Sequence, residues 1–157
     1  MKSTHIDNVM TLSYPDGFHE MSERELAEIQ FLNDEKGICI SDPERHIIIS
    51  SGYQQVNGFA AMILSGKDII TRDEKIIAKW METLGYYREG FVKKDVSGKK
   101  AEGMCYTYTK NDLKMYAESL VIKNGKTLYY LHYYTRNELK ENNVRIWESI
   151  LSRIQWQ

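Results

Sequence analysis

Cysteine and proline are scarce in this sequence, and the shortage of cysteine excludes one class of protein. The 157 residues include two prolines and two cysteines, Cys39 and Cys105, which lie far apart and form no CxxC pair. A small secreted domain held by a disulfide framework is therefore excluded, although a single bridge between the two thiols stays open. A chain of this length buries about two thirds of its unfolded surface. We therefore expect one domain over residues 1–157, with two reduced and buried thiols.

An excess of charge of one sign is also missing. The formal net charge is −1, and acidic and basic residues are interspersed. A nucleic-acid partner is not expected, because phosphate binding requires a basic stripe. The chain has neither an apolar run long enough to span a bilayer nor a basic amphipathic helix to lie on one. Residues 1–8 lack the apolar core of a signal peptide, so we expect a cytoplasmic protein without a membrane partner.

The motifs of common chemistries are absent as well. No GxSxG nucleophile elbow and no GxGxxG or GxxxxGK phosphate cradle occurs. The histidines form neither HxH nor HxxxH spacing; they are His5, His19, His46 and His132. A zinc site would normally bring such pairs at short spacing. We therefore predict no cofactor and no metal, and we favour a protein that is not an enzyme.

Three segments have the start signals of a helix, each with a capping box in which Ser or Thr is followed three residues later by Glu. The boxes are Ser22 with Glu25, Thr71 with Glu74, and Thr135 with Glu138. Apolar residues at helical spacing follow each box, such as Leu26, Ile29 and Leu32 after the first. A short helix is expected within residues 58–66, and Gly85 is expected to end the second long helix.

The other periodic segments have the alternation or the β-branched runs typical of strands. They are residues 10–15, 37–41, 46–53, 87–95, 100–109, 113–123 and 127–135. Asn124-Gly125 between the last two is the strongest short hairpin signal. Short connections make the last four strands antiparallel neighbours. Residues 1–9 are expected to form a flexible N-terminal segment.

The strand predicted at residues 127–135 is apolar or aromatic on both faces. Its odd positions carry Tyr129, Leu131 and Tyr133, and its even positions carry Leu128, Tyr130, His132 and Tyr134. Such a strand is usually covered on both sides. The sequence therefore predicts an α+β fold, in which a largely antiparallel sheet of about six to seven strands is packed between helices as an α/β/α sandwich.

The order of the predicted turns, strands and helices along the chain is itself informative. Residues 12–18 (LSYPDGF) lead into the first helix, hairpins lie around Gly98 and Asn124-Gly125, and residues 129–132 (YYLH) run towards the terminal helix. This arrangement, over roughly residues 10–155, resembles the PsbP-like fold family. That family includes the extrinsic oxygen-evolving subunit of photosystem II, a yeast Ran-binding nucleotide-release factor and many small bacterial proteins of unknown role. The resemblance implies a binding or assembly module without a shared active site, and no functional residue carries over from it.

Tyr130, His132 and Tyr134 form the most suggestive local set. Residues at i and i+2 of a strand share a face, and a histidine can act as acid, base or ligand near neutral pH. One interpretation is a pocket for a small ligand. The other, which we favour, is a histidine of a central strand that only forms hydrogen bonds beneath a helix.

Two further segments could contact a partner. The predicted loop over residues 52–59 carries Tyr53 and Phe59, and loops on a rigid scaffold often bear function. Trp156 near the C-terminus would be a good contact anchor if exposed, although we expect it to fold back onto the core. These patterns favour a non-catalytic binding or assembly module of a bacterial cytoplasmic protein, with a protein partner. The alternative is a small enzyme or ligand-binding protein with a pocket near His132. The oligomeric state stays open.

Overall fold

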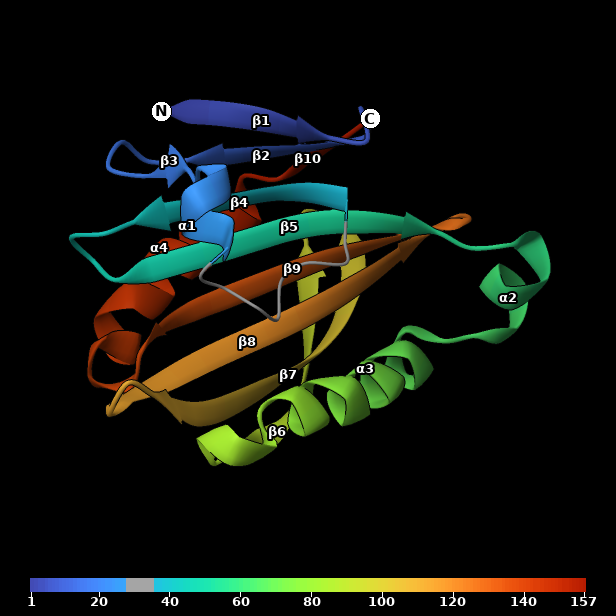
Figure 1. The fold of residues 1–157 in the computed structure, drawn as a ribbon. Coiled ribbons are helices and arrows are strands. Elements are labelled where there is room, and N and C mark those ends of the chain that lie inside the picture. Colours follow the sequence, from blue (N-terminus) through green and yellow to red (C-terminus); the bar gives the residue numbers. More distant parts are fainter. Residues whose placement is uncertain (28–35) are drawn as a thin grey trace.

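A long antiparallel sheet forms the centre of the computed structural model, which describes residues 1–27 and 36–157 (Figure 1). Within these residues the sheet has seven strands in the order β3-β4-β5-β9-β8-β7-β6. Their bounds are β3 His19–Glu20, β4 Lys36–Asp42, β5 Ile47–Gln55, β9 Thr127–Arg136, β8 Leu113–Asn124, β7 Lys99–Lys110 and β6 Tyr87–Val96. All neighbouring strands are antiparallel. The predicted α+β class, with a sheet packed against helices, is confirmed.

The four strands β6 to β9 form the predicted meander, and their turns use residues that tolerate a positive φ. Gly98 (φ 92°), Asn111 (φ 52°) and Gly125 (φ 63°) lie in the three turns. A left-handed conformation costs glycine little and is adopted by asparagine more readily than by most residues. Asn124 pairs with Thr127 across the last turn, as the Asn-Gly signal predicts.

Strand β5 joins the N-terminal part of the chain to the meander. It pairs with β4 on one side and with β9 on the other, from Ile47 opposite Thr135 to Gln55 opposite Thr127. The β-branched run at residues 47–49 is therefore an interior strand, because apolar side chains on both faces need a layer on each side.

A small second sheet corrects the prediction for residues 1–9. Strand β1 (Lys2–Ile6) pairs with β2 (Met10–Tyr14), and β2 also pairs with β10 (Gln155–Trp156). Asp7 and Asn8 make the turn between β1 and β2 with φ values of 54° and 53°. Their side chains tolerate this conformation, and the hairpin buries Ile6 to 2% exposure. Residues 1–9 thus contain a paired strand where a flexible segment was expected.

The helices are α1 (Glu23–Ala27), α2 (Gly58–Ile63), α3 (Gly66–Trp80) and α4 (Lys140–Ser152), with short 3₁₀ turns at Glu82–Leu84 and Asn137–Leu139. The capping box before α1 is confirmed, since Ser22 Oγ accepts from Glu25 N at 3.2 Å and Glu25 Oε1 accepts from Ser22 N at 3.1 Å. The predicted apolar positions Ile29 and Leu32 lie outside the described residues. Gly85 ends the turn after α3 in the left-handed conformation, with φ 68°.

The second predicted capping box is wrong, because the N-cap of α3 is Ser65, six residues before Thr71. Ser65 and Asp68 form the box instead, with both hydrogen bonds at 3.1 Å. The sequence Ser65-Gly66-Lys67-Asp68 carries the same pattern upstream, and starting there brings the buried pair at residues 69–70 into the helix. Thr71 consequently lies inside α3, where its hydroxyl donates to the carbonyl oxygen of Lys67 at 2.7 Å.

The third predicted capping box is also wrong. Thr135 belongs to β9 and is completely buried, and α4 begins only at Lys140, after the 3₁₀ turn. The Thr135 hydroxyl accepts a hydrogen bond from Asn143 Nδ2 at 2.9 Å. It therefore ties the sheet to α4 instead of capping the helix.

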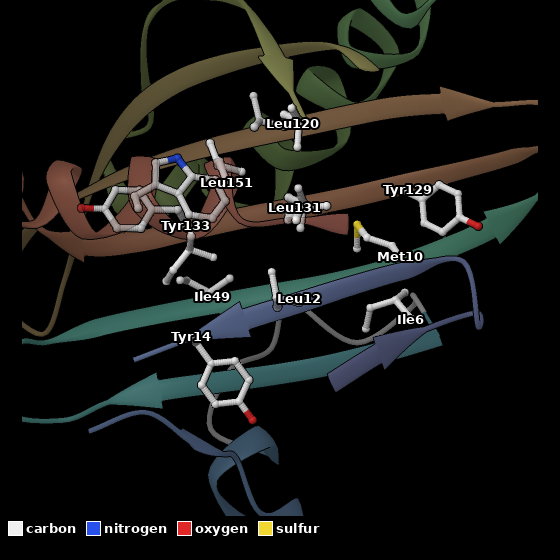
Figure 2. Close-up of a cluster of buried hydrophobic side chains, with 14 of the residues drawn as sticks. Ile6, Met10, Leu12, Tyr14, Ile49, Leu120, Tyr129, Leu131, Tyr133 and Leu151 are labelled. Carbon is white, nitrogen blue, oxygen red and sulfur yellow. The ribbon is translucent and has the colours of Figure 1, made fainter. Parts of the chain in front are cut away.

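The large sheet separates two apolar cores. The α3 face of the sheet is the face that packs against α3 and carries Tyr130 and Tyr134. The opposite face, which carries Leu131 and Tyr133, is the α4 face. It is covered by α4 together with the small sheet, so this layer is not helical throughout. Figure 2 shows residues of the small sheet (Ile6, Met10, Leu12 and Tyr14) beside those of the large sheet (Ile49, Leu120, Tyr129, Leu131 and Tyr133) and Leu151 of α4.

Candidate binding surface

The predicted site residues fall in three separate places. Tyr130, His132 and Tyr134 lie on the α3 face of β9, each at most 8% exposed. Their rings stack in a column, with the imidazole centroid 6.3 Å from each tyrosine centroid. Tyr53 belongs to the end of β5, not to a loop, and lies half-buried against Tyr129 on the α4 face. Phe59 lies on α2 and is 73% exposed.

His132 takes part in a chain of buried polar groups across the sheet. Its Nδ1 lies 2.8 Å from Ser119 Oγ on β8, and Ser119 Oγ lies 3.0 Å from the Tyr106 hydroxyl on β7. Ser119 and Tyr106 are both completely buried. The contacts satisfy hydroxyls and an imidazole that would otherwise be costly to bury. A serine without solvent exposure is not placed to attack a substrate, so this arrangement is structural in the conformation described.

Sequence reasoning missed a second polar cluster, on the α4 face. The Glu118 carboxylate, on a residue only 4% exposed, accepts hydrogen bonds from Lys94 Nζ at 2.9 Å and from Trp147 Nε1. Cys105 Sγ donates to it at 3.5 Å, and Lys94 also pairs with Glu148 of α4. The available signal was a single acid in the otherwise uncharged stretch 115–122 of β8 (Leu113–Asn124).

The environment of the Glu118 cluster argues against covalent catalysis. Burial, with a further contribution from nearby Glu118, raises the pKa of the Cys105 thiol to about 11. The thiol is therefore protonated near neutral pH and is a poor nucleophile. Burial disfavours the charged form of Lys94, but the hydrogen bond to Glu148 and the charge of Glu118 outweigh it and raise its pKa. We interpret the cluster as an ion-paired anchor that holds α4 on the sheet.

Helix α2 differs from both clusters because its apolar side chains face solvent. Phe59 is 73% exposed, Met62 83% and Ile63 60%, and Ala61 is the buried residue of the helix. The helix begins where Asn57 Oδ1 accepts a hydrogen bond from Ala60 N at 2.8 Å. It projects beyond the end of the large sheet (Figure 1). Of the predicted site residues, Phe59 alone lies on this surface.

Two lysines of the β8–β9 hairpin flank α2. Lys123 Nζ donates to the carbonyl oxygen of Leu64 at 2.9 Å, just after the helix ends. At the other end, a methyl group on Gly58 would lie 3.3 Å from Lys126 Cε, so the Lys126 side chain lies over the first turn. The exposed apolar surface is thus bounded by a lysine at each end.

Metal-ligating and membrane-spanning features are missing from the described part of the chain. Within residues 1–27 and 36–157, no three His, Cys, Asp or Glu side chains converge as a metal site would require. None of the helices over those residues has the length and apolar character needed to cross a bilayer.

Comparisons by sequence found no matching family model and no matching curated protein. Solved structures do match. The structural alignment with cyanobacterial PsbP (CyanoP) from Synechocystis sp. PCC 6803 covers 99% of this chain and 92% of the PsbP chain, with a TM-score of 0.70 and 13% identity. The chain has a PsbP-like fold.

Two other solved structures show the same PsbP-like architecture. LpqN of Mycobacterium tuberculosis, which is involved in cell envelope biogenesis, covers 98% of the chain and 88% of its own length, with a TM-score of 0.61 and 13% identity. The Pseudomonas aeruginosa T6SS immunity protein TplEi, solved with an "L" peptide, covers 96% of the chain and 59% of its own length, with a TM-score of 0.52 and 8% identity. At these identities the likeness concerns the fold alone.

Among the clusters described above, α2 is the candidate site, because the other two are buried. His132 and Glu118 lie inside the two cores, where their polar atoms already have partners. The side chains of α2 are exposed, apolar and held on a connection between β5 and α3. Such apolar side chains can bind another surface, and none of Phe59, Met62 and Ile63 carries an acid, a base or a nucleophile.

Proposed function

We propose that the chain is a non-catalytic protein-binding module and that α2 forms its contact surface. The observation that carries the proposal is the exposure of Phe59, Met62 and Ile63 on a helix of six residues. Single exposed apolar side chains are normal on any protein, but adjacent ones that form a patch mark interaction sites.

The composition of the patch supports a protein partner. Aromatic residues and methionine are enriched at protein interfaces, where they fill apolar pockets of the other chain. The flexible side chain of Met62 adapts to irregular surfaces, and the ring of Phe59 is large enough to act as an anchor. Their exposed position costs free energy in the isolated chain that a partner would recover on binding.

The structural relatives are consistent with such a role. The immunity protein TplEi has been solved with a bound peptide, so one protein of this architecture associates with a polypeptide. The buried state of His132, Ser119 and Cys105 adds a second argument, since none of these side chains is presented to a substrate. Together these points favour binding over catalysis.

The test compares the natural chain with two matched variants. Phe59→Ser, Met62→Ser and Ile63→Ser are combined in a patch variant, and Ile76→Ser with Trp80→Ser form the control, because these are half-exposed apolar residues of α3. Each protein is used to retain partners from an extract of the source cells, and the retained partner is then purified and titrated by calorimetry.

The patch variant is expected to bind the purified partner at least about tenfold more weakly, as loss of a hot spot does. The control variant is expected to bind as the natural chain does. Equal affinity for the patch variant, with circular dichroism showing both variants folded, would refute a role for α2. Turnover of a substrate by the pure protein would refute the non-catalytic role.

A further inference from the structure

Two lysines beside α2 indicate which chemical groups its partner would present. Lys123 and Lys126 both come from the β8–β9 hairpin, and the backbone of this hairpin is tied to the start of α2 by a hydrogen bond from Val56 N to Lys126 O at 2.8 Å. The Lys123 ammonium is held at the other end by the Leu64 carbonyl oxygen. The Lys123 charge therefore has a fixed place at the end of α2, and the Lys126 side chain lies over its first turn.

Within residues 1–27 and 36–157, neither ammonium group forms an ion pair. In the described residues the ion pairs of lysine side chains belong to Lys93 and Lys94, and no carboxylate lies within ion-pair distance of Lys123 or Lys126. The acid nearest to α2 in sequence, Asp68, is occupied in the capping box with Ser65, and the backbone hydrogen bond from Ser65 lowers the pKa of Asp68.

Further lysines lie close by but are occupied. Lys67 Nζ lies 3.1 Å from the centroid of the Phe91 ring, and Lys99 Nζ donates to Asn124 Oδ1 at 3.3 Å. The acids described on this side are Asp68 in its capping box and Glu102 beside Gly66. Among the described residues the charges next to α2 are therefore mostly lysines, although the whole chain has a net charge of −1.

We infer, on the basis of the proposed function, that the partner presents an apolar segment flanked by Asp or Glu side chains to α2. The apolar residues of the segment would cover Phe59, Met62 and Ile63, and its carboxylates would pair with Lys123 and Lys126. Complementary charges at the rim of an interface increase the association rate and fix its register.

Charge also decides between other occupants of the surface. A second copy docked through the same surface would bring the lysines of each α2 face to face, and like charges at an interface are costly. An anionic bilayer is attracted by clusters of four to eight basic residues. Two lysines frame α2, and the neighbouring Lys67 and Lys99 are occupied by Phe91 and Asn124. The Lys123 ammonium is also held by the Leu64 carbonyl oxygen, which suits a partner with a matching fixed charge.

The test uses three synthetic peptides that share one Leu/Phe apolar core and differ in their flanking residues, which are Glu, Gln or Lys. Binding is followed by ¹⁵N–¹H NMR at the amides of residues 56–66 and 123–127. The Glu peptide is expected to shift these amides and to bind at least about tenfold more tightly than the Gln peptide. Added salt is expected to reduce this difference, because the charges are exposed.

Variants separate the lysine charges from their structural contacts. Lys126→Gln leaves the bond between Lys123 and Leu64 intact, and Lys123→Gln with Lys126→Gln removes both charges. The control is Lys75→Gln with Lys114→Gln, which removes two exposed charges away from α2. The preference for the Glu peptide is expected to fall in Lys126→Gln, to vanish in the double variant and to persist in the control.

Equal affinity for the Glu and Gln peptides would overturn the inferred partner chemistry while leaving α2 as a protein-binding surface. The same holds if none of the peptides shifts the α2 amides and the natural partner still loses affinity in the patch variant. A final experiment tests whether the chain co-sediments with vesicles of phosphatidylcholine and phosphatidylglycerol. Co-sedimentation of the natural chain, lost in the patch variant, would overturn the protein partner in favour of a lipid surface.

Discussion

Glu118 on β8 accepts the indole N–H of Trp147 on α4, and this hydrogen bond joins a buried carboxylate of the sheet to the helix that covers it. Trp147 also stacks on Tyr133 of β9, with ring centroids 5.2 Å apart. Lys94 of β6 completes the arrangement by pairing with Glu118 and with Glu148. Strands β6, β8 and β9 are therefore connected to α4 through one polar contact point inside an apolar layer.

Glu118→Gln is expected to lower the free energy of unfolding by about 2–3 kcal/mol. The amide keeps the shape of the side chain, but it removes the charge that offsets the burial of Lys94. Urea unfolding followed by tryptophan fluorescence measures the change. Glu141→Gln, on an exposed position of α4, is the control and is expected to unfold as the natural chain does. An unchanged midpoint for Glu118→Gln would show that the ion pair contributes nothing to stability.

Alanine substitutions at two glycines of the large sheet are expected to change the free energy of unfolding in opposite directions. A methyl group at Gly103 would lie 2.4 Å from the Ser119 carbonyl oxygen, whereas one at Gly90 would meet nothing within 4 Å. Gly103→Ala is expected to cost about 2–4 kcal/mol because backbone must move. Gly90→Ala is expected to gain up to about 1 kcal/mol, since alanine restricts the unfolded chain. Thermal unfolding of the two variants tests the pair, and similar midpoints would contradict the packing at Gly103.

The free energy of unfolding is expected to fall at alkaline pH because the Cys105 thiol ionises more readily in the unfolded chain. The folded chain raises the pKa of this thiol to about 11, whereas an unfolded thiol titrates near about 8.5. Because the unfolded chain loses the proton first, the stabilising contribution is complete below about pH 8.5 and declines as the pH rises towards 11. The limiting slope is about 1.4 kcal/mol per pH unit.

The measurement compares the natural chain with Cys105→Ala in urea at several pH values between about 7 and 10. The difference in unfolding free energy is expected to be constant at the lower pH values and to shrink above about pH 8.5. The subtraction cancels the titration of the tyrosines other than Tyr116, whose pKa is raised by burial and by its hydrogen bond with Cys105. A difference that stays constant over the whole range would show that the buried thiol has an ordinary pKa.

His132→Ala is expected to cost about 1–3 kcal/mol, because the completely buried Ser119 hydroxyl would lose one of its two partners and keep only Tyr106. Binding of the partner to α2 is expected to stay unchanged, since the two sites lie on different elements. Ser119→Ala is the companion variant and should cost a similar amount. A small molecule that stabilises the natural chain against heat, but not His132→Ala, would instead favour the alternative of a ligand pocket near His132.

Local signals in the sequence predicted most of the large sheet. The turn at Asn124-Gly125, the β-branched run at residues 47–49 and the capping box at Ser22 each depend on neighbouring residues, and each was predicted correctly. The errors arise where pairing and burial decide between alternatives that the local pattern leaves open. Strand β1 depends on pairing with β2, and the Thr135 hydroxyl is occupied by Asn143 of the following helix.

The candidate surface was predicted only in part, for a related reason. Exposure depends on what covers a residue, and a sequence pattern does not show it. Phe59 was predicted as a contact residue, but Met62 and Ile63 were not singled out and were covered only by the short helix expected within residues 58–66. The same limit applies to Glu118, because its three hydrogen-bond donors come from strands β6 and β7 and from α4.

The pairing of β5 with β9 has a consequence for how the chain folds. Strands β6 to β9 are joined by short turns, so their contacts are local and can form quickly. Strand β5 instead meets β9 only after the chain from residue 56 to residue 126 has closed into a loop, which carries an entropic cost. The meander can therefore form first and serve as the template on which β5, and then β4, are added. Amide exchange during refolding should show β7 and β8 protected before β4.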